Sequence, residues 1–356
     1  MRVPILAGLI SCLAVAGGSY LALRADPRNG LLAQAQAEGS VEVYGNADAK
    51  AVTPLIAAFQ ARHPALKVQY RVLESASVYR RFVDETDAGR PSADLVWSSA
   101  MDLQAKLIND GYAQSYASPE RRAMPASAVW KDMGYGVTLE PVALVYNKRL
   151  IAPDQVPHTH QALEQLLTTR RAALAGRVTT YDPARSNLGY LYLTQDYATT
   201  RDTGALLRAI AATRPQLSAT TAPMIDAVAS GRAAIAYNVV GSYALERAHA
   251  DPRLGVVFPQ DYTIVASRVA FVARGARHPA AARLFLDFLL SRDGQSLLAR
   301  AWLPPVRSDI PGLRLGPEQA RPIRGGPQLF VNLDPVKRQR FLADWNAILA
   351  EGANKP

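Results

Sequence analysis

The stretch YGVTLEPVALVYN, residues 135–147, decides the fold. It is rich in β-branched and apolar residues and is longer than an ordinary strand, which has about five or six residues. We interpret it as a crossover that carries the chain from one domain into a second. A matching stretch, TIVASRVAFVA at residues 263–273, returns the chain to the first domain. Two such crossovers predict two lobes that are joined by a pair of strands and close on a ligand by hinge motion.

Short β-rich runs alternate with segments of helical periodicity along the chain, which predicts an α/β fold. We expect strands at residues 41–44, 66–73, 94–97, 178–181 and 233–237, and helices at 50–62, 77–88, 101–109, 161–174, 279–290, 293–301 and 335–350. Further helices are expected to start near residues 186, 203 and 242. The first lobe is predicted from residues 40–138 plus 270–356 and the second from 143–262, with hinge strands at about 139–142 and 263–269.

The composition is that of an ordinary globular protein. The 356 residues are 49% hydrophobic and 20% charged, with 40 Lys and Arg against 30 Asp and Glu. The formal charge of +10 is scattered along the chain, so we expect no nucleic-acid partner but a field that favours small anions or a negative membrane surface. The single cysteine, Cys12, lies in an apolar N-terminal stretch, which excludes an internal disulfide and a cysteine-based zinc site in the body. We expect a monomer.

The N-terminal segment predicts export. Residues 3–23 are apolar and uncharged, with Arg2 before them and Arg24 after them. The sequence AQA at residues 35–37 has the small-x-small form of a cleavage site, so residues 1–37 are predicted to be a signal peptide or, uncleaved, an N-terminal membrane anchor. A lipidated Cys12 is a further alternative. Each reading places the body in an exported compartment, which we take to be the periplasm.

Small polar residues occur where predicted strands end and helices begin. Helix N-termini carry free N–H groups and a positive dipole end, which bind anions, and strand exits of open α/β sheets converge on one crevice. The alternative is that these residues only cap helices. Arg185 could pair with an anion bidentately or form a surface ion pair. The candidate ligand-binding residues are Ser75, Ser77, Ser98, Ser99, Thr180, Arg185, Ser186, Asn187, Asn238, Ser242 and Tyr243.

The sequence contains no recognisable catalytic constellation. A G-x-S-x-G elbow, a P-loop, an H-E-x-x-H motif and a G-x-G-x-x-G turn after a strand are all missing. His158 and His160 could hold a metal, but we interpret them as part of a solvent-exposed turn. We therefore predict a binding protein without catalytic residues, metal or cofactor, rather than an enzyme.

Five segments resemble the periplasmic solute-binding proteins of ABC transporters, in the branch that contains ferric-iron binders and phosphoglycerate or hexose-phosphate binders. They are VEVYG (41–45), ADLVWSS (93–99), LVYNK (144–148), TYDPARS (180–186) and AYNVVGSY (236–243). The resemblance covers about residues 40–310. It implies a two-lobed type II binding-protein fold that captures one ligand in the cleft and delivers it to a permease or a sensor kinase.

The resemblance also bears on the ligand. Ferric-iron binders of this branch have two adjacent tyrosines near the helix that follows the AYN strand, whereas this chain has Ser242 and Tyr243 there. The turn at residues 45–47 offers no histidine. Because Fe³⁺ prefers hard anionic donors, we expect a small organic anion, by preference phosphorylated. The alternative is a ferric-iron-binding protein of an iron transporter.

Overall fold

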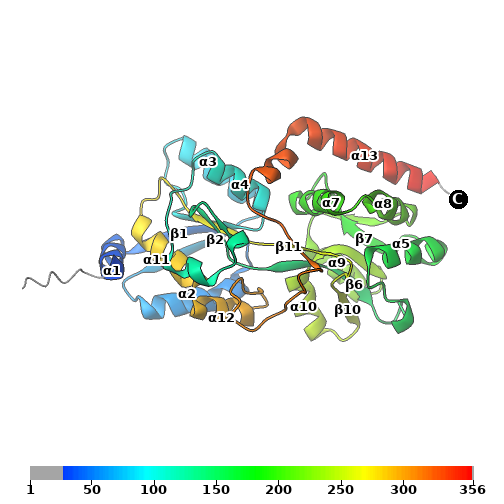
Figure 1. Ribbon diagram of the computed structural model, residues 1–356, viewed down its shortest axis with the longest axis horizontal. Coiled ribbons are helices and arrows are strands. Elements are labelled where there is room, and N and C mark those ends of the chain that lie inside the picture. Colours follow the sequence, from blue (N-terminus) through cyan, green and yellow to red (C-terminus); the bar gives the residue numbers. More distant parts are fainter. Residues whose placement is uncertain (1–26, 355–356) are drawn as a thin grey trace, which may run out of the picture.

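The computed structural model describes residues 27–354 and contains two lobes, each built on its own sheet (Figure 1). The predicted α/β fold with two lobes is therefore confirmed. The apolar segment at residues 3–23, predicted to be a signal or an anchor, lies outside the described residues. No helix formed by residues 27–354 is long and apolar enough to cross a bilayer.

The first lobe contains a six-stranded mixed sheet. In spatial order its strands are β2 (Lys67–Val72), β1 (Ser40–Gly45), β3 (Leu95–Ser98), β12 (Val269–Val272), β5 (Gly134–Gly136) and β4 (Val129–Trp130). One face is covered by α2 (Ala49–Arg62), α11 (Pro279–Leu290) and α12 (Arg292–Arg300), the other by α3 (Ser75–Asp87) and α4 (Met101–Asn109). The apolar stripe of α2, which includes Val52, Leu55 and Phe59, is fully buried against this sheet and α11, as the helical spacing predicts.

The second lobe contains a sheet with the order β13 (Ala320–Pro322), β11 (Thr263–Ala266), β6 (Glu140–Asn147), β9 (Ile235–Val240), β7 (Val178–Tyr181) and β8 (Gln216–Ser218), and β10 (Leu254–Val257) pairs with β6. On one face lie α7 (Asn187–Thr199) and α8 (Thr203–Ala212), and on the other α9 (Thr221–Ala229) and α10 (Gly241–Ala250). The helices α5 (His160–Thr169) and α6 (Arg171–Leu174) complete this lobe, and the 3₁₀ turns η1 (Pro119–Ala123), η2 (Ala126–Ala128) and η3 (Pro153–Gln155) lie in connections.

The two crossovers are short and are bonded to each other. Residues 137–139 lead from β5 into β6, and Ser267 and Arg268 lead from β11 into β12. The N–H of Val137 donates to the carbonyl of Arg268 at 2.8 Å, and the N–H of Arg268 donates to Thr138 Oγ1 at 2.9 Å. The hinge is therefore a hydrogen-bonded pair of strands rather than two independent linkers.

The C-terminal segment differs from the expectation. We expected residues 335–356 in the first lobe, but α13 (Pro335–Asn354) packs on α8 of the second lobe, where Trp345 is buried. Before α13, the 3₁₀ helix η4 (Pro327–Leu333) packs on α4 of the first lobe. An amphipathic stripe alone does not tell which of two neighbouring lobes a terminal helix covers, because both offer an apolar face.

The helix α1 (Pro27–Glu38) packs on α11. Ala35 is fully buried in the core of the first lobe, and both carboxylate oxygens of Glu38 accept N–H bonds from Ala280 and Ala281 at the start of α11. The expected cleavage after Ala37 would fall inside this helix and would remove Ala35 from the core.

Candidate ligand-binding cleft

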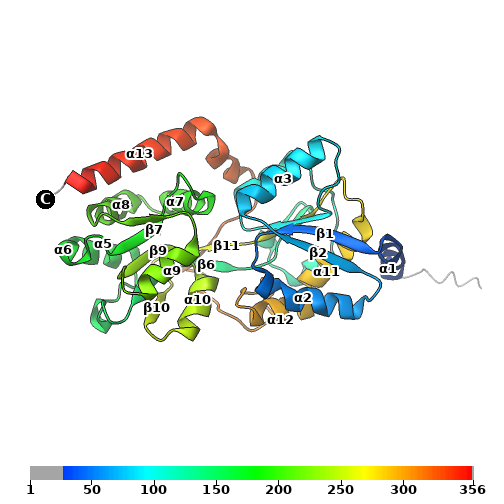
Figure 2. The same cartoon turned by 180° about the vertical axis from the view of Figure 1, so that it is seen from behind.

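An open cleft of about 760 Å³ lies between the two lobes. Its floor is formed by the crossover residues Glu140 and 266–268, and its walls by the ends of helices from both lobes. Figure 2 shows α3 on one side of the crossing strand β11, and α9 and α10 on the other. A ligand in this cleft would touch the hinge and both lobes.

A buried ion pair between Arg268 and Glu140 forms the floor. The Arg268 Nε lies 2.9 Å from Glu140 Oε1, and the two residues are only 2% and 3% exposed. Arg268 Nη1 also donates to Asn46 Oδ1 at 2.9 Å, while Glu140 accepts from Thr138 at 2.8 Å and from Ser242 at 3.0 Å. Burial favours the neutral guanidine, but the Glu140 carboxylate together with Tyr243 and Tyr70 outweighs burial and raises the pKa of Arg268 above its ordinary value. The cation is thus held in place at the floor of the cleft.

Hydroxyl groups of the first lobe surround Asn46. The side-chain amide of Asn46 donates to Ser75 Oγ and to Ser99 Oγ, both at 2.6 Å, and its oxygen accepts the N–H of Ser99 at 3.1 Å. Ser75 is the first residue of α3, and Ser99 follows β3 directly. The hydroxyls are therefore fixed at the point where the strand ends of this lobe meet the cleft.

In the second lobe, the turn between β7 and α7 brings three candidates to the cleft, Arg185, Ser186 and Asn187. The turn is folded on Asp182, whose carbonyl accepts the N–H of Ser186 at 2.8 Å. The hydroxyl of Ser186 caps α7 by accepting the N–H of Gly189 at 3.1 Å. This arrangement aims the N-terminus of α7 into the cleft and leaves the Arg185 side chain exposed at its mouth.

Three tyrosines line the cleft, and all are held neutral. Burial raises the pKa of Tyr181 and of Tyr243, and the Arg268 cation beside Tyr243 opposes that rise without reversing it. Burial likewise raises the pKa of Tyr192. The hydroxyl of Tyr181 is hydrogen-bonded to that of Thr221, and Tyr243 accepts from Arg268 Nη2 at 3.4 Å. These groups offer neutral hydroxyls rather than phenolates.

The eleven candidates from the sequence divide into two groups. Six of them line the cleft, namely Ser75, Ser99, Arg185, Ser186, Asn187 and Tyr243. The other five make contacts elsewhere. Ser98 is buried and accepts the N–H of Ala100 at 3.2 Å, and Ser77 lies inside α3, where Arg80 donates to it at 3.5 Å.

The remaining three candidates belong to the interior of the second lobe and the hinge. Thr180 donates to the carbonyl of Tyr237 at 3.4 Å, and Ser242 donates to Glu140. Asn238, whose φ is 61°, donates to Asp196 Oδ2 at 2.8 Å. Asp196 is fully buried and also accepts from Tyr237 and Tyr262, so Asn238 is part of an internal hydrogen-bond network.

Many residues of the cleft were not among the candidates, and they include Asn46, Glu140, Thr221 and Arg268. A signal was present for two of them, because Glu140 and Arg268 are single charges within the apolar runs that form the crossovers. Charged residues are rarely buried unless they are paired. Within residues 27–354, no three His, Cys, Asp or Glu side chains gather where they could hold a metal ion.

Comparison with known proteins agrees with this geometry. The model of the family "Bacterial extracellular solute-binding protein" matches residues 41–302. A crystal structure of the substrate binding protein of the ABC transporter from Agrobacterium tumefaciens is 36% identical, covers 87% of this chain and 94% of that chain, and superposes with a TM-score of 0.80. Among curated proteins, none matches the chain.

More distant structures share the fold. AfuA from Actinobacillus pleuropneumoniae, with exogenous fructose-6-phosphate bound, is 18% identical over 88% of this chain and 99% of that chain, with a TM-score of 0.67. Iron-bound HitA from Pseudomonas aeruginosa is 16% identical over the same shares, 88% and 99%, with a TM-score of 0.64. The chain therefore belongs to the bacterial extracellular solute-binding proteins, and it is a solute-binding protein of an ABC transporter rather than an enzyme.

Proposed function

We propose that the protein captures a small organic anion, by preference a phosphorylated one, and presents it to an ABC permease from the periplasm. The observation that carries this proposal is that three helices begin at the cleft. The residue before the helix and its first two residues line the cleft in each case: 74–76 for α3, 186–188 for α7 and 220–222 for α9. Helix N-termini present free N–H groups and a positive dipole end to anions.

Charged side chains of both signs line the cleft. Arg185 at the mouth presents a guanidinium group, which matches the geometry of phosphate and carboxylate, and the buried, paired Arg268 lies at the floor. The carboxylates of Asp48, Glu74, Asp226 and Glu246 also line the cleft. The volume of about 760 Å³ is in the range of sites for organic ligands and exceeds what a bare inorganic anion needs. Hydroxyls of Ser75, Ser99 and Tyr243 would bind the uncharged part of such a ligand. The fold of AfuA with fructose-6-phosphate bound supports this ligand class.

The competing ligand is Fe³⁺, because the fold is also that of iron-bound HitA. Iron would need anionic oxygen donors. The phenols of Tyr181, Tyr192 and Tyr243 are held neutral, and the carboxylate of Glu140 is occupied by Arg268. Asp48, Glu74, Asp226 and Glu246 also line the cleft, but within residues 27–354 no three His, Cys, Asp or Glu side chains gather where they could hold a metal ion. Fe³⁺ would therefore need phenolates as well, and the buried phenols would have to lose protons, which disfavours its binding.

A thermal-shift screen of the full chain tests the proposal. The panel contains inorganic phosphate, 3-phosphoglycerate, fructose 6-phosphate, glucose 6-phosphate, succinate, citrate and ferric citrate. A ligand at 100 times its Kd stabilises the folded state by about 2.7 kcal/mol, which raises the unfolding midpoint by several degrees. A shift with phosphorylated compounds supports the proposal. A shift with ferric citrate alone, accompanied by a visible phenolate-to-iron band, would establish the iron alternative instead.

Arg185→Gln gives the sharper test of charge, with Arg201→Gln, another exposed arginine of the second lobe, as the matched control. We expect Arg185→Gln to weaken binding of the phosphorylated compound by about 1.5 to 3 kcal/mol, the range for a hydrogen bond to a charged group, and Arg201→Gln to leave it unchanged. Equal affinities for all three proteins would show that the anion does not lie at the start of α7.

The same capture step would serve delivery to a sensor kinase, and an N-terminal anchor would suit that role. Reconstitution with a candidate permease separates the two. Ligand-stimulated ATP hydrolysis in the presence of the protein supports transport, and its absence with a functional permease would favour sensing.

A further inference from the structure

The C-terminal segment, residues 303–354, follows the residues matched by the family model and touches both lobes. We call residues 320–354 the strap. The strap begins with β13, which pairs in parallel with the crossing strand β11, so that Ala320 faces Thr263. It continues through η4 on α4 of the first lobe and ends with α13 on α8 of the second (Figure 1). The strap therefore crosses the gap between the lobes a further time.

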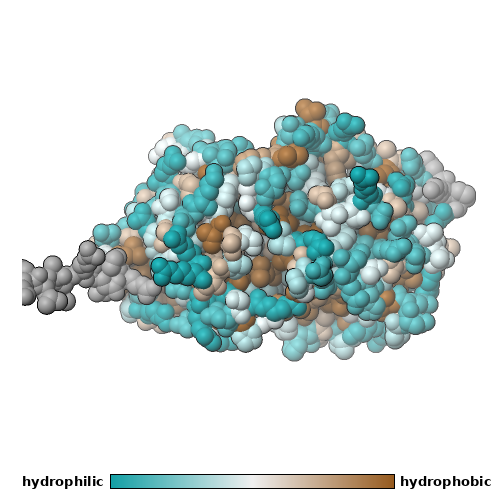
Figure 3. Space-filling model, viewed as in Figure 1, coloured by the Kyte–Doolittle hydropathy of each residue, from teal (hydrophilic) through white to brown (hydrophobic). Residues whose placement is uncertain are grey.

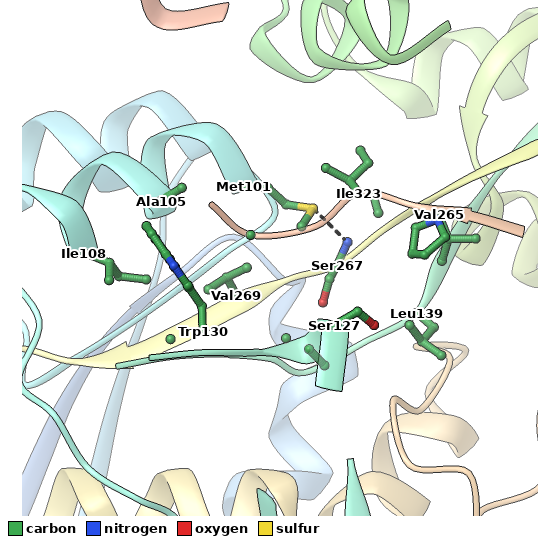
Figure 4. Close-up of a pocket in the computed structure, with 16 residues that line it drawn as sticks. Met101, Ala105, Ile108, Ser127, Trp130, Leu139, Val265, Ser267, Val269 and Ile323 are labelled. Atoms are coloured by element: carbon green, nitrogen blue, oxygen red, sulfur yellow. Dashed lines mark hydrogen bonds between the residues drawn. The ribbon is translucent and has the colours of Figure 1, made fainter. Parts of the chain in front are cut away.

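The strap packs beside the hinge strand. Residues 266–268 line the cleft, and Val265, Ser267 and Val269 line a small apolar pocket of about 30 Å³ together with Ile323 of the strap. Figure 4 shows Ile323 of the strap in this pocket, beside Met101 of α4 and Ser267 of the crossover. None of residues 320–354 lines the cleft, so the strap can act on the cleft only through the elements that it contacts.

One of these elements is the ligand-binding turn of the second lobe. Arg338 Nη2 donates to the carbonyl of Pro183 at 3.2 Å, and its guanidinium lies 4.5 Å from the ring centroid of Tyr190. Pro183 is buried in the same turn as Arg185 and Ser186, which line the cleft, and Tyr190 is in the first turn of α7. Arg338 therefore contacts both the turn and the start of the helix.

The part of α13 that carries Arg338 is held in place by several contacts. Asp334 Oδ1 caps α13 by accepting the N–H groups of Val336 and Lys337, at 2.8 and 3.1 Å. Phe341 packs edge-on against Tyr190, with the ring centroids 5.1 Å apart. Trp345 is 2% exposed in the core of the second lobe. The outer side of the strap faces solvent, with Val336 74% exposed, and Figure 3 shows apolar atoms on the surface at the start of α13.

The charge of Arg338 also acts on the first lobe without a direct contact. It slightly lowers the pKa of the buried carboxyl of Asp102, which lies in the first turn of α4. This helix follows Ser99, one of the hydroxyls of the cleft, and packs on η4.

We infer that Arg338 is a positioning residue for ligand binding: from the strap it holds the turn at residues 182–187 so that Arg185, Ser186 and Asn187 face the cleft. The inference rests on the proposed function only for the class of ligand. It predicts that loss of the guanidinium loosens the turn locally, while the lobes and their cores stay folded.

The test uses the full chain with Arg338→Met, which keeps the length of the side chain, and Arg338→Lys, which restores a cation and a donor. Arg340→Met is the control, because Arg340 is exposed on the same helix. Amide hydrogen exchange without ligand is followed by mass spectrometry. We expect peptides within residues 182–193 to exchange about tenfold faster in Arg338→Met, with partial rescue in Arg338→Lys and no change in Arg340→Met. The Kd for 3-phosphoglycerate, measured by calorimetry, should rise at least fivefold in Arg338→Met.

Two results would overturn the inference: exchange at residues 182–193 like that of the original protein, or a uniform increase across the second lobe, which would show a general structural role. Faster exchange at the turn with an unchanged Kd for 3-phosphoglycerate would also overturn it, because the turn would then not need positioning. If the original protein binds no phosphorylated compound, the proposed function fails, and the exchange experiment alone decides whether Arg338 holds the turn.

Discussion

Asp102 gives a prediction that depends on burial and can be read as a function of pH. The residue is 2% exposed in the first turn of α4, and its Oδ1 has no hydrogen-bond partner within the described part of the chain. Burial raises the pKa of Asp102 from 3.8 to about 6, although two backbone N–H groups and the Arg338 cation act in the opposite direction. Between these two pKa values, the carboxyl of Asp102 is therefore protonated in the folded protein and ionised in the unfolded chain.

The sign and size of the effect follow from this difference. Because the pKa is higher in the folded state, the contribution of Asp102 to stability is greatest at low pH and is lost as the pH rises through about 6. The full difference corresponds to about 3 kcal/mol, of which about 2 kcal/mol falls between pH 4.5 and pH 8. Above about pH 6 the folded state carries the buried, incompletely paired carboxylate of Asp102.

Replacement of Asp102 by Asn removes the charge and keeps the shape. We expect the stability of Asp102→Asn relative to the original protein to increase by about 2 kcal/mol between pH 4.5 and pH 8, measured by urea unfolding at several pH values. Asp84→Asn, at an exposed position of α3, is the control and should show no such trend. A difference that stays constant across this pH range would refute the reasoning, because Asp102 would then titrate alike in both states.

Three further predictions follow from the hinge and the N-terminal helix. Arg268→Met should destabilise the protein by about 3 to 5 kcal/mol in urea unfolding, because it leaves Glu140 buried without its cation. Adding Glu140→Gln should restore most of that loss. Equal stability of the single and double variants would contradict the pairing. Tyr243→Phe should weaken calorimetric binding of 3-phosphoglycerate by about 0.5 to 1.5 kcal/mol, and neither it nor the original protein should develop a visible band with Fe³⁺. A chain starting at Glu38 should unfold several degrees below one starting at Pro27, since it lacks the burial of α1 on α11; identical midpoints would show that this helix adds no stability.

The architecture could be predicted because the decisive signals are local. The apolar runs at residues 135–147 and 263–273 are too long for single strands, and they do carry the chain between the lobes. The expected strand at 41–44 is β1 and the expected helix at 50–62 is α2. The helix α9 was missed, because its sequence, TAPMIDAVA, contains a proline and lacks a polar stripe. The lobe covered by α13 could not be predicted, since it depends on how distant apolar faces fit together.

The candidate site could be predicted only in part, because polarity at a strand exit does not fix the direction of a side chain. Ser99 faces the cleft, whereas its neighbour Ser98 is buried and caps the following turn. Asn238 turns into the lobe because buried Asp196 needs its amide. Arg268 was missed because it is a single charge within the otherwise apolar run at residues 263–273. The charge is tolerated there only because Glu140, from the other crossover, pairs with it.

The position of the Arg268 and Glu140 pair on the crossovers has a consequence for the order of events in binding. Residues at a pivot move least when the two bodies around it rotate, so the floor of the cleft has the same geometry before and after closure. A ligand can therefore first dock on the floor in the open protein, and the walls reach it afterwards. In stopped-flow experiments the observed rate should rise linearly with ligand concentration at low concentration and then level off at the rate constant of closure. The saturating rate would report the closure of the lobes about the hinge, and the initial slope would report docking on the floor of the cleft.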